Sequence, residues 1–205
     1  MDKKHGEHLM KSTEEPADQS TQDFFRKDYL NKSDLRETGF GGTEEEWRYC
    51  RKIILQAVDH DGKMLDLGCA NGRLVSDLHS WAKEEGISLD VYGVDFVAEL
   101  VEKAKKRMPE ITDHFDVADI NDYVPKQKFD YIRTEIIHLN PNRIKEILER
   151  YLSKLSSGGK LIISRYDDQD EDQFQRFINY IKSLKINNFD VVQNEATCLV
   201  IFKKL

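Results

Sequence analysis

The chain has 205 residues, 39% of them hydrophobic, which is enough for one domain with a substantial core and leaves little room for a second. The net charge of −7 disfavours a nucleic-acid substrate, because an acidic surface repels phosphate backbones. The absence of long apolar runs, of a signal peptide and of CxxC pairs predicts a cytoplasmic protein with reduced thiols and no membrane partner. Residues 1–22 are polar and without periodicity, and are predicted to be a disordered tail.

Aromatic residues gather in the next segment, 23–48. We expect this segment to form a lid over the substrate cleft, within a single domain spanning 23–205. Thr43 and Glu46 fit a capping box, which predicts a helix that begins there. Trp47 starts the helical pattern, and the alternative to a lid role is that its ring packs under the sheet.

From residue 63 the pattern alternates between strands and helices, which indicates a mostly parallel sheet covered on both faces. The closing stretch FDVVQNEATCLVIFKK leaves no room for a helix between its two apolar runs, so these runs are predicted to pair as an antiparallel hairpin. The other predicted strands are 63–69, 89–95, 114–118, 129–135 and 160–164, and the predicted helices between them include 71–85, 97–107 and 171–185.

The helix after the fourth strand has signals at both of its expected ends. Asn140 precedes Pro141, a pair typical of an N-cap followed by proline at the first helical position. Gly158 and Gly159 suit the left-handed turn that closes a helix. We therefore expect this helix to lie between these two pairs.

The stretch MLDLGCANGRL, residues 64–74, leads a strand into a glycine turn that opens a helix, as in folds that bind nucleotide-like ligands. The dinucleotide fingerprint GxGxxG fails at Ala70 and Arg73, and a phosphate loop fails because no lysine follows Gly72. Asp66, two residues before the turn, suits a ligand with positive charge. S-adenosylmethionine carries an ammonium and a sulfonium and no phosphate, so it meets this requirement.

Acidic residues also end the next two strands. Asp95 follows Gly72 at about the 20-residue distance typical of a carboxylate that holds ribose hydroxyls, and Phe96 could lie against the adenine. Asp119 could accept a hydrogen bond from the adenine amino group, although a capping role is the alternative in its acid-rich surroundings. We expect these carboxylates to line one crevice at the carboxyl ends of the strands.

These segments resemble the class I S-adenosylmethionine-dependent methyltransferases. The resemblance covers about residues 45–205 and rests on LDLGCANG, YGVDF, DVADI, FDYIRTE and SSGGKLIIS in this order. It implies an α/β fold, a Rossmann-like three-layer sandwich with a mostly parallel seven-stranded sheet and an antiparallel C-terminal hairpin strand. The chain departs from the family at Ala70, where glycine is frequent, and at Arg133, whose burial in an apolar strand is costly unless the guanidinium finds a partner.

The resemblance also implies roles for individual residues. Thr134 and Glu135 would lie near the methyl group and the acceptor, with Glu135 a candidate catalytic residue. The Ile120 backbone would meet the adenine edge beside Asp119. The methionine side of the pocket would be shaped by Asp66, Gly68, Ala70 and Gly72.

His138 follows the fourth strand, close to where a methyl acceptor is expected. It is a candidate general base, and an exposed loop histidine is the alternative. The chemistry does not require a base, because displacement at an activated sulfonium gains about 7–11 kcal/mol from positioning alone. Residues 166–172 form an acidic run that favours a helix N-terminus over a metal site, and no metal is expected.

The sequence thus predicts an enzyme that transfers a methyl group from S-adenosylmethionine to an oxygen or nitrogen of a small-molecule acceptor, leaving S-adenosylhomocysteine. One alternative is a protein or RNA methyltransferase, against which the missing basic patch argues in the case of RNA. The other is a catalytically silent cofactor-binding partner protein of the same fold. The complete set of acids and glycines argues against an empty pocket but not against a silent one.

Overall fold

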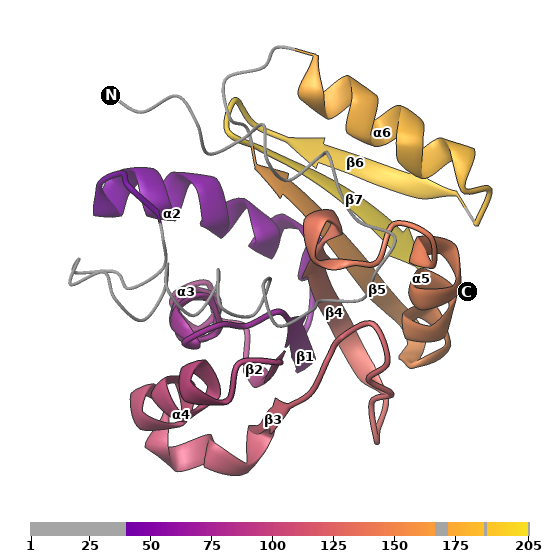
Figure 1. Ribbon diagram of the computed structural model, residues 1–205. Coiled ribbons are helices and arrows are strands. Elements are labelled where there is room, and N and C mark those ends of the chain that lie inside the picture. The colour runs from indigo at the N-terminus through magenta and orange to yellow at the C-terminus, as the bar shows by residue number, and fades with distance from the viewer. Residues whose placement is uncertain (1–39, 167–171, 187, 205) are drawn as a thin grey trace.

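The computed structural model describes residues 40–166, 172–186 and 188–204 (Figure 1). The predicted tail over 1–22 and most of the predicted lid over 23–48 lie outside the described residues, as does most of the acidic run. Within the described part of the chain, no helix has the length and apolar content to cross a membrane.

One sheet of seven strands forms the centre of the molecule. Its strands are β1 (Gly62–Leu67), β2 (Leu89–Asp95), β3 (Phe115–Val117), β4 (Phe129–Glu135), β5 (Leu155–Tyr166), β6 (Phe189–Gln193) and β7 (Thr197–Lys203). They lie in the order β3-β2-β1-β4-β5-β7-β6, and β7 runs antiparallel to both of its neighbours while the other pairs are parallel. The predicted mostly parallel sheet with a C-terminal antiparallel hairpin is confirmed.

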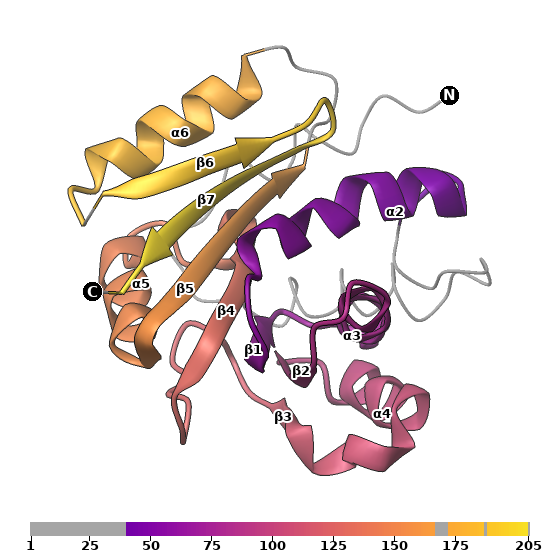
Figure 2. The same ribbon diagram turned by 180° about the vertical axis from the view of Figure 1, so that it is seen from behind.

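Helices cover both faces of this sheet, giving three layers (Figures 1 and 2). The helices are α2 (Glu44–Lys52), η1 (Ile53–Ala57), α3 (Arg73–Glu84), α4 (Ala98–Arg107), η2 (Pro109–His114), η3 (Ile136–His138), α5 (Ile144–Ser153) and α6 (Gln173–Ser183). One apolar core joins α2, η1, α3 and α4 to the sheet, and a second joins α5 and α6 to its other face. Both faces of the central strands are therefore buried, which explains their nearly continuous apolar sequences.

The start of α5 differs from the prediction. The side-chain oxygen of Asn140 accepts a hydrogen bond from the backbone N–H of Asn142 at 3.0 Å, and the N–H of Arg143 donates to the Asn140 carbonyl at 3.0 Å. These bonds close a local turn around Pro141, and the helix begins only at Ile144. The prediction of an N-cap at Asn140 is therefore wrong, because its side chain stabilises a turn that precedes the helix.

The end of α5 also differs. The helix stops at Ser153, and Gly158 and Gly159 lie inside β5. Gly158 has a φ of +76°, and a Cβ on Gly159 would lie 3.0 Å from the carbonyl oxygen of Asp130. The two glycines thus allow β5 to bend close against β4 where the register of this pair shifts, rather than closing a helix.

Candidate cofactor and acceptor site

The glycine turn lies between β1 and α3, at the carboxyl edge of the sheet. β2 and β3 extend the sheet on one side of β1, and β4 and the later strands extend it on the other side. The carboxyl end of β1 is therefore a topological switch point. The backbone φ is +84° at Gly68, +46° at Ala70 and +72° at Gly72. A Cβ on Gly72 would lie 2.7 Å from the Cβ of Ala104, so glycine here also lets α3 approach α4.

Asp95, at the end of β2, holds this turn in place. Its Oδ2 accepts a hydrogen bond from the N–H of Ala70 at 2.9 Å, and its Oδ1 accepts from the N–H of Val97 at 2.9 Å. Burial raises the pKa of Asp95, and the hydrogen bonds from these two amides act in the opposite direction. Each carboxylate oxygen can accept a further hydrogen bond, so the predicted contact with a ribose stays compatible with this geometry.

Three charged side chains on β1 and β4 form a cluster that we call the buried charge triad: Asp66, Arg133 and Glu135. Arg133 lies opposite Asp66 in the register, and its Nη1 donates to Asp66 Oδ1 at 3.0 Å. Its Nη2 donates to Glu135 Oε1 at 2.8 Å. Ser164 Oγ and the Tyr166 hydroxyl, on β5, accept further hydrogen bonds from Arg133 at 2.7 Å each. The cost of burying the Arg133 guanidinium in an otherwise apolar strand is thus offset by hydrogen bonds to polar partners on both neighbouring strands.

Burial and charge act against each other within the triad. Burial raises the pKa of Asp66, with the charge of Arg133 opposing this effect. The pKa of Arg133 is raised well above its usual range despite burial, because acidic groups surround it. Burial would also raise the pKa of Glu135, but the charges of Arg133 and its neighbours outweigh it and the net shift is downward. Glu135 is therefore an anion and a weak base at neutral pH.

His138 lies directly against the glycine turn. A Cβ on Gly68 would be 2.6 Å from its Nδ1, so the glycine is what allows the ring this position. The ring therefore lies beside the turn that Asp95 holds and close after Glu135 in the chain. The structure thus brings His138 and Glu135 together at the switch point, while their catalytic roles stay predictions.

The remaining predicted residues lie around the same edge, with their polar groups engaged locally. The Thr134 hydroxyl is fully buried and donates to the Leu67 carbonyl at 3.2 Å. Asp119 Oδ1 accepts from the N–H of Asn121 at 2.8 Å within a local turn, and its contact with an adenine stays a prediction. The buried Ile120 accepts a hydrogen bond from the Tyr151 hydroxyl through its carbonyl.

Phe96 is half-buried immediately after β2. Because Phe96 directly follows Asp95, it lies on the side of the predicted pocket where the adenine is expected. Its contact with an adenine stays a prediction.

Two residues of the site were not found from the sequence. Tyr166 was noted only as the start of an acidic run, yet two guanidinium groups lie close to its ring, with Arg51 at 3.3 Å and Arg133 at 5.8 Å from the ring centroid. Arg51 belongs to α2 and also lies 4.8 Å from the Trp47 ring. The Trp47 indole donates to Asp77 at 2.7 Å, so this ring packs against α3. The only signal in the sequence was the charge of Arg133 within an apolar strand. This charge predicts polar partners for the guanidinium but does not identify them.

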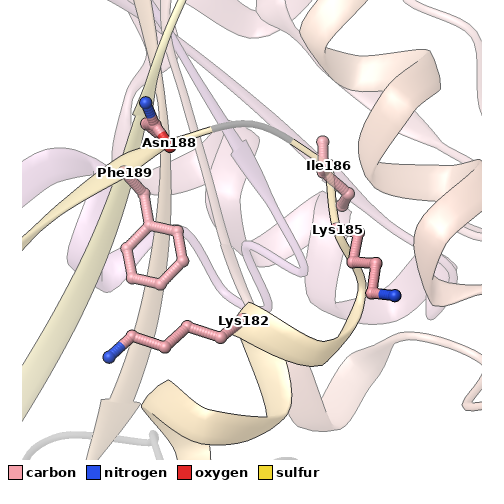
Figure 3. Close-up of a pocket in the computed structure, with 5 residues that line it drawn as sticks. All are labelled: Lys182, Lys185, Ile186, Asn188 and Phe189. Carbon is pink, nitrogen blue, oxygen red and sulfur yellow. The ribbon is translucent and has the colours of Figure 1, made fainter.

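A separate hollow lies between the end of α6 and the start of β6, lined by Lys182, Lys185, Ile186, Asn188 and Phe189 (Figure 3). Phe189 pairs with Phe202, which pairs with Leu161 near the amino end of the parallel part of β5. This hollow is therefore at the edge of the sheet opposite the glycine turn and takes no part in the site.

The methyltransferase domain family model matches residues 59–197. Trans-aconitate 2-methyltransferase from Rhizobium etli (strain ATCC 51251 / DSM 11541 / JCM 21823 / NBRC 15573 / CFN 42) is 28% identical over 130 residues, which cover 62% of this chain and 48% of that protein. The same enzyme from Rhodopseudomonas palustris (strain HaA2) is 29% identical over 135 residues, with the same coverage. The chain thus spans about half the length of the curated relatives it matches.

Solved structures with the same fold include N-methyltransferase NodS from Bradyrhizobium japonicum WM9 in complex with S-adenosyl-l-homocysteine. The TM-score is 0.64 at 14% identity, covering 89% of this chain and 97% of NodS. The DhpI–SAH complex has a TM-score of 0.67 at 15% identity, covering 90% of this chain and 96% of DhpI. These similarities confirm the Rossmann-like sandwich predicted from the sequence.

Proposed function

This chain belongs to the methyltransferase domain family, and from that premise we propose that it transfers a methyl group from S-adenosylmethionine to an oxygen or nitrogen of a small-molecule acceptor. The observation that carries the proposal is a glycine turn at the switch point, bordered by the buried carboxylates of Asp66 and Asp95. The curated relatives are named for a small organic acid, which supports a small-molecule acceptor. The solved NodS and DhpI structures contain the product of S-adenosylmethionine, which supports the cofactor.

The residues of the turn fit this cofactor. Asp66 Oδ2 is buried and has no hydrogen-bond partner within the described residues, so it is available to a donor or a positive group of a ligand. Asp95 lies at the next strand end with acceptor capacity left for a ribose diol. A pyrophosphate would meet both carboxylates as like charges, and an adenosyl group with an ammonium and a sulfonium would not.

When bound, the cofactor supplies an electrophilic methyl group on a positively charged sulfur. The contribution of the chain is to orient the two reactants, since alignment alone supplies a large part of such a displacement. We assign the orienting role to the turn held by Asp95, and the acceptor side to Glu135 and His138. We place this activity in the cytoplasm, where the three cysteines would stay reduced.

The cofactor assignment is tested by binding of S-adenosylhomocysteine to Asp95→Ala, measured by calorimetry. We expect at least tenfold weaker binding, because the variant loses both the ribose acceptor and the anchor of the Ala70 amide. Asp90→Ala is the matched control, because Asp90 is an exposed carboxylate on the same strand, away from the turn. Circular dichroism checks that both variants fold.

Unchanged affinity in the Asp95 variant would refute the site. The choice of cofactor is tested further by a thermal-shift measurement with S-adenosylmethionine, S-adenosylhomocysteine and NAD. A shift with NAD alone would overturn the proposed cofactor.

A further inference from the structure

Glu135 has the most exposed side chain of the buried charge triad. Its side chain is 20% exposed, whereas those of Asp66 and Arg133 are 3% and 1% exposed. It is the last residue of β4, and η3 follows at once and places His138 on the glycine turn. The carboxylate therefore lies between the buried guanidinium and the space beside the turn, where an acceptor has to approach.

The position of this carboxylate is fixed. Its Oε1 accepts a hydrogen bond from Arg133, whose guanidinium is in turn held by Asp66 and by Ser164. Since the guanidinium is shared between two carboxylates, the triad as a whole carries one negative charge when both are ionised. The second oxygen of Glu135 takes part in no hydrogen bond found among the described residues and can accept one from a ligand.

A fixed negative charge at this point distinguishes between acceptor types. When a neutral amine accepts a methyl group, the positive charge moves from sulfur to nitrogen, and a carboxylate beside the nitrogen stabilises that charge as it develops. An acceptor that reacts as an anion, such as a carboxylate or a phenolate, would instead be repelled. A neutral hydroxyl has to lose its proton to a base, and a carboxylate paired with Arg133 is a poor one, so that role would fall to His138, whereas a neutral amine reacts without a base.

We propose that the acceptor is an amine whose N–H group donates to Glu135, which makes Glu135 the residue that determines nitrogen specificity. The nitrogen lone pair forms the new N–C bond while the C–S bond breaks, and the electron pair of that bond stays on the sulfur of S-adenosylhomocysteine. The methylated nitrogen then carries the positive charge and releases its extra proton to water. This inference rests on the proposed function and narrows its acceptor to one class.

Arg133 acts in this proposal as a positioning residue for Glu135. The acceptor class also differs from the one named for the curated relatives, because trans-aconitate is a tricarboxylate and would place several negative charges beside Glu135. We therefore expect no transfer to trans-aconitate.

The test uses the full chain, S-adenosylmethionine labelled with tritium in its methyl group, and a deproteinised bacterial small-molecule extract as the acceptor pool. Unreacted S-adenosylmethionine is itself a retained cation, so its label is measured in a reaction without the protein and subtracted. An N-methyl product is retained on a cation-exchange column beyond this background and keeps its label in mild base. A methyl ester releases volatile labelled methanol in base. A methyl ether is stable in base, but its uncharged oxygen does not bind the column. We expect the label in the retained, base-stable fraction, and expect prior acylation of the amines in the extract to abolish its incorporation.

The variant Glu135→Gln keeps the size of the side chain and an oxygen for Arg133 but loses the negative charge. We expect at least a tenfold drop in labelled amine, with the affinity for S-adenosylhomocysteine within threefold of the wild type. Glu149→Gln, at an exposed position on α5, is the control and should leave incorporation unchanged. Equal incorporation by Glu135→Gln and the wild type would overturn the role of Glu135.

The failure of this inference is distinguishable from the failure of the proposed function. Label in volatile methanol, or in neutral or anionic products, would refute the amine acceptor and leave methyl transfer standing. No label in any fraction, from a protein that binds S-adenosylhomocysteine, would count against methyl transfer itself.

Discussion

At the scale of single residues, Arg133 is the largest of the fully buried side chains in the described part of the chain, and it carries a charge. It is a fully buried cation whose hydrogen bonds reach β1, β5 and the end of its own strand. A buried ion pair of this kind adds little net stability compared with an apolar pair, but removing one partner leaves an uncompensated charge. The triad is therefore more understandable as part of the site than as a stabilising feature.

The variant Arg133→Met tests this view. We expect it to lower the free energy of unfolding by about 3–5 kcal/mol, because Asp66 stays buried without its cation. Urea unfolding at neutral pH measures the change. Adding Asp66→Leu should recover part of the loss, because it removes the more deeply buried of the two carboxylates that lose Arg133.

Arg143→Met is the matched control for this measurement. Arg143 is exposed and pairs with Asp122 and Glu146 at the surface, so its replacement should change stability little. A loss for Arg133→Met no larger than that of the control would contradict the account of the triad.

At the scale of elements, the start of α2 follows directly from the sequence. The Thr43 hydroxyl accepts from the Glu46 N–H at 3.2 Å, and Glu46 Oε2 accepts from the Thr43 N–H at 2.6 Å, so the predicted capping box is confirmed. The helix it begins carries Trp47 against α3 and Arg51 against Tyr166. The capping box thus stabilises one wall of the site.

Replacing Thr43 by alanine should lower the free energy of unfolding by about 1 kcal/mol, since one amide of the first turn loses its acceptor. Thermal or urea unfolding measures this loss. Ser80→Ala, within α3, removes a hydroxyl that bonds only to the Ser76 carbonyl of its own helix, and should have a smaller effect. Equal effects of the two variants would show that the cap contributes nothing specific.

Strands and helix ends differ in how well the sequence predicts them. The bounds predicted for β2 and β4 are those observed, because apolar runs between turn residues identify buried strands. Both predicted ends of α5 are wrong. Asparagine suits a turn as well as an N-cap, and glycine suits a bent strand as well as the end of a helix, as Asn140 and Gly158 show. Whether such a residue ends a helix, forms a turn or bends a strand depends on the element that packs beside it.

At the scale of the whole molecule, Asp59 joins the helical layer to the sheet. It follows η1, and its carboxylate accepts from Lys160 on β5 at 2.8 Å and from the Tyr131 hydroxyl on β4 at 3.1 Å. The hydrogen bond from Lys160 lowers the pKa of Asp59 below its ordinary value, with burial opposing. The carboxylate therefore favours the folded chain above its unfolded pKa of about 3.9, and this contribution is lost as the pH falls.

The variant Asp59→Asn tests this contribution. We expect the wild type to exceed it in stability by less than about 1 kcal/mol from pH 7 to 5, because the side chain is 58% exposed and screened by solvent. The gap should shrink as the pH falls below the unfolded pKa of about 3.9, because the unfolded chain then binds a proton that the folded carboxylate of Asp59 resists. Urea unfolding at several pH values measures the gap.

Asp61→Asn is the control for this titration, because Asp61 accepts from the Ser88 backbone rather than from a lysine. Its gap from the wild type should vary less with pH. A gap for Asp59→Asn that is constant or grows on acidification would refute the assigned role of Asp59.

The sequence by itself determined the order of strands and helices, the sheet with its final hairpin, and the glycine turn bordered by Asp66 and Asp95. These features depend on apolar periodicity and on backbone conformations that glycine favours, and both are local in the chain. They were enough to indicate the family and to exclude phosphate-bearing ligands.

Only the tertiary structure decided which charges meet. Asp66 and Arg133 are 67 residues apart in the chain, and they pair because β1 and β4 are neighbours in a register that places them opposite each other. The same sheet order brings His138 onto Gly68 and leaves the Glu135 side chain partly exposed. Side-chain partners across a sheet follow from strand order and register, which no local pattern records, and the inferred acceptor depends on them.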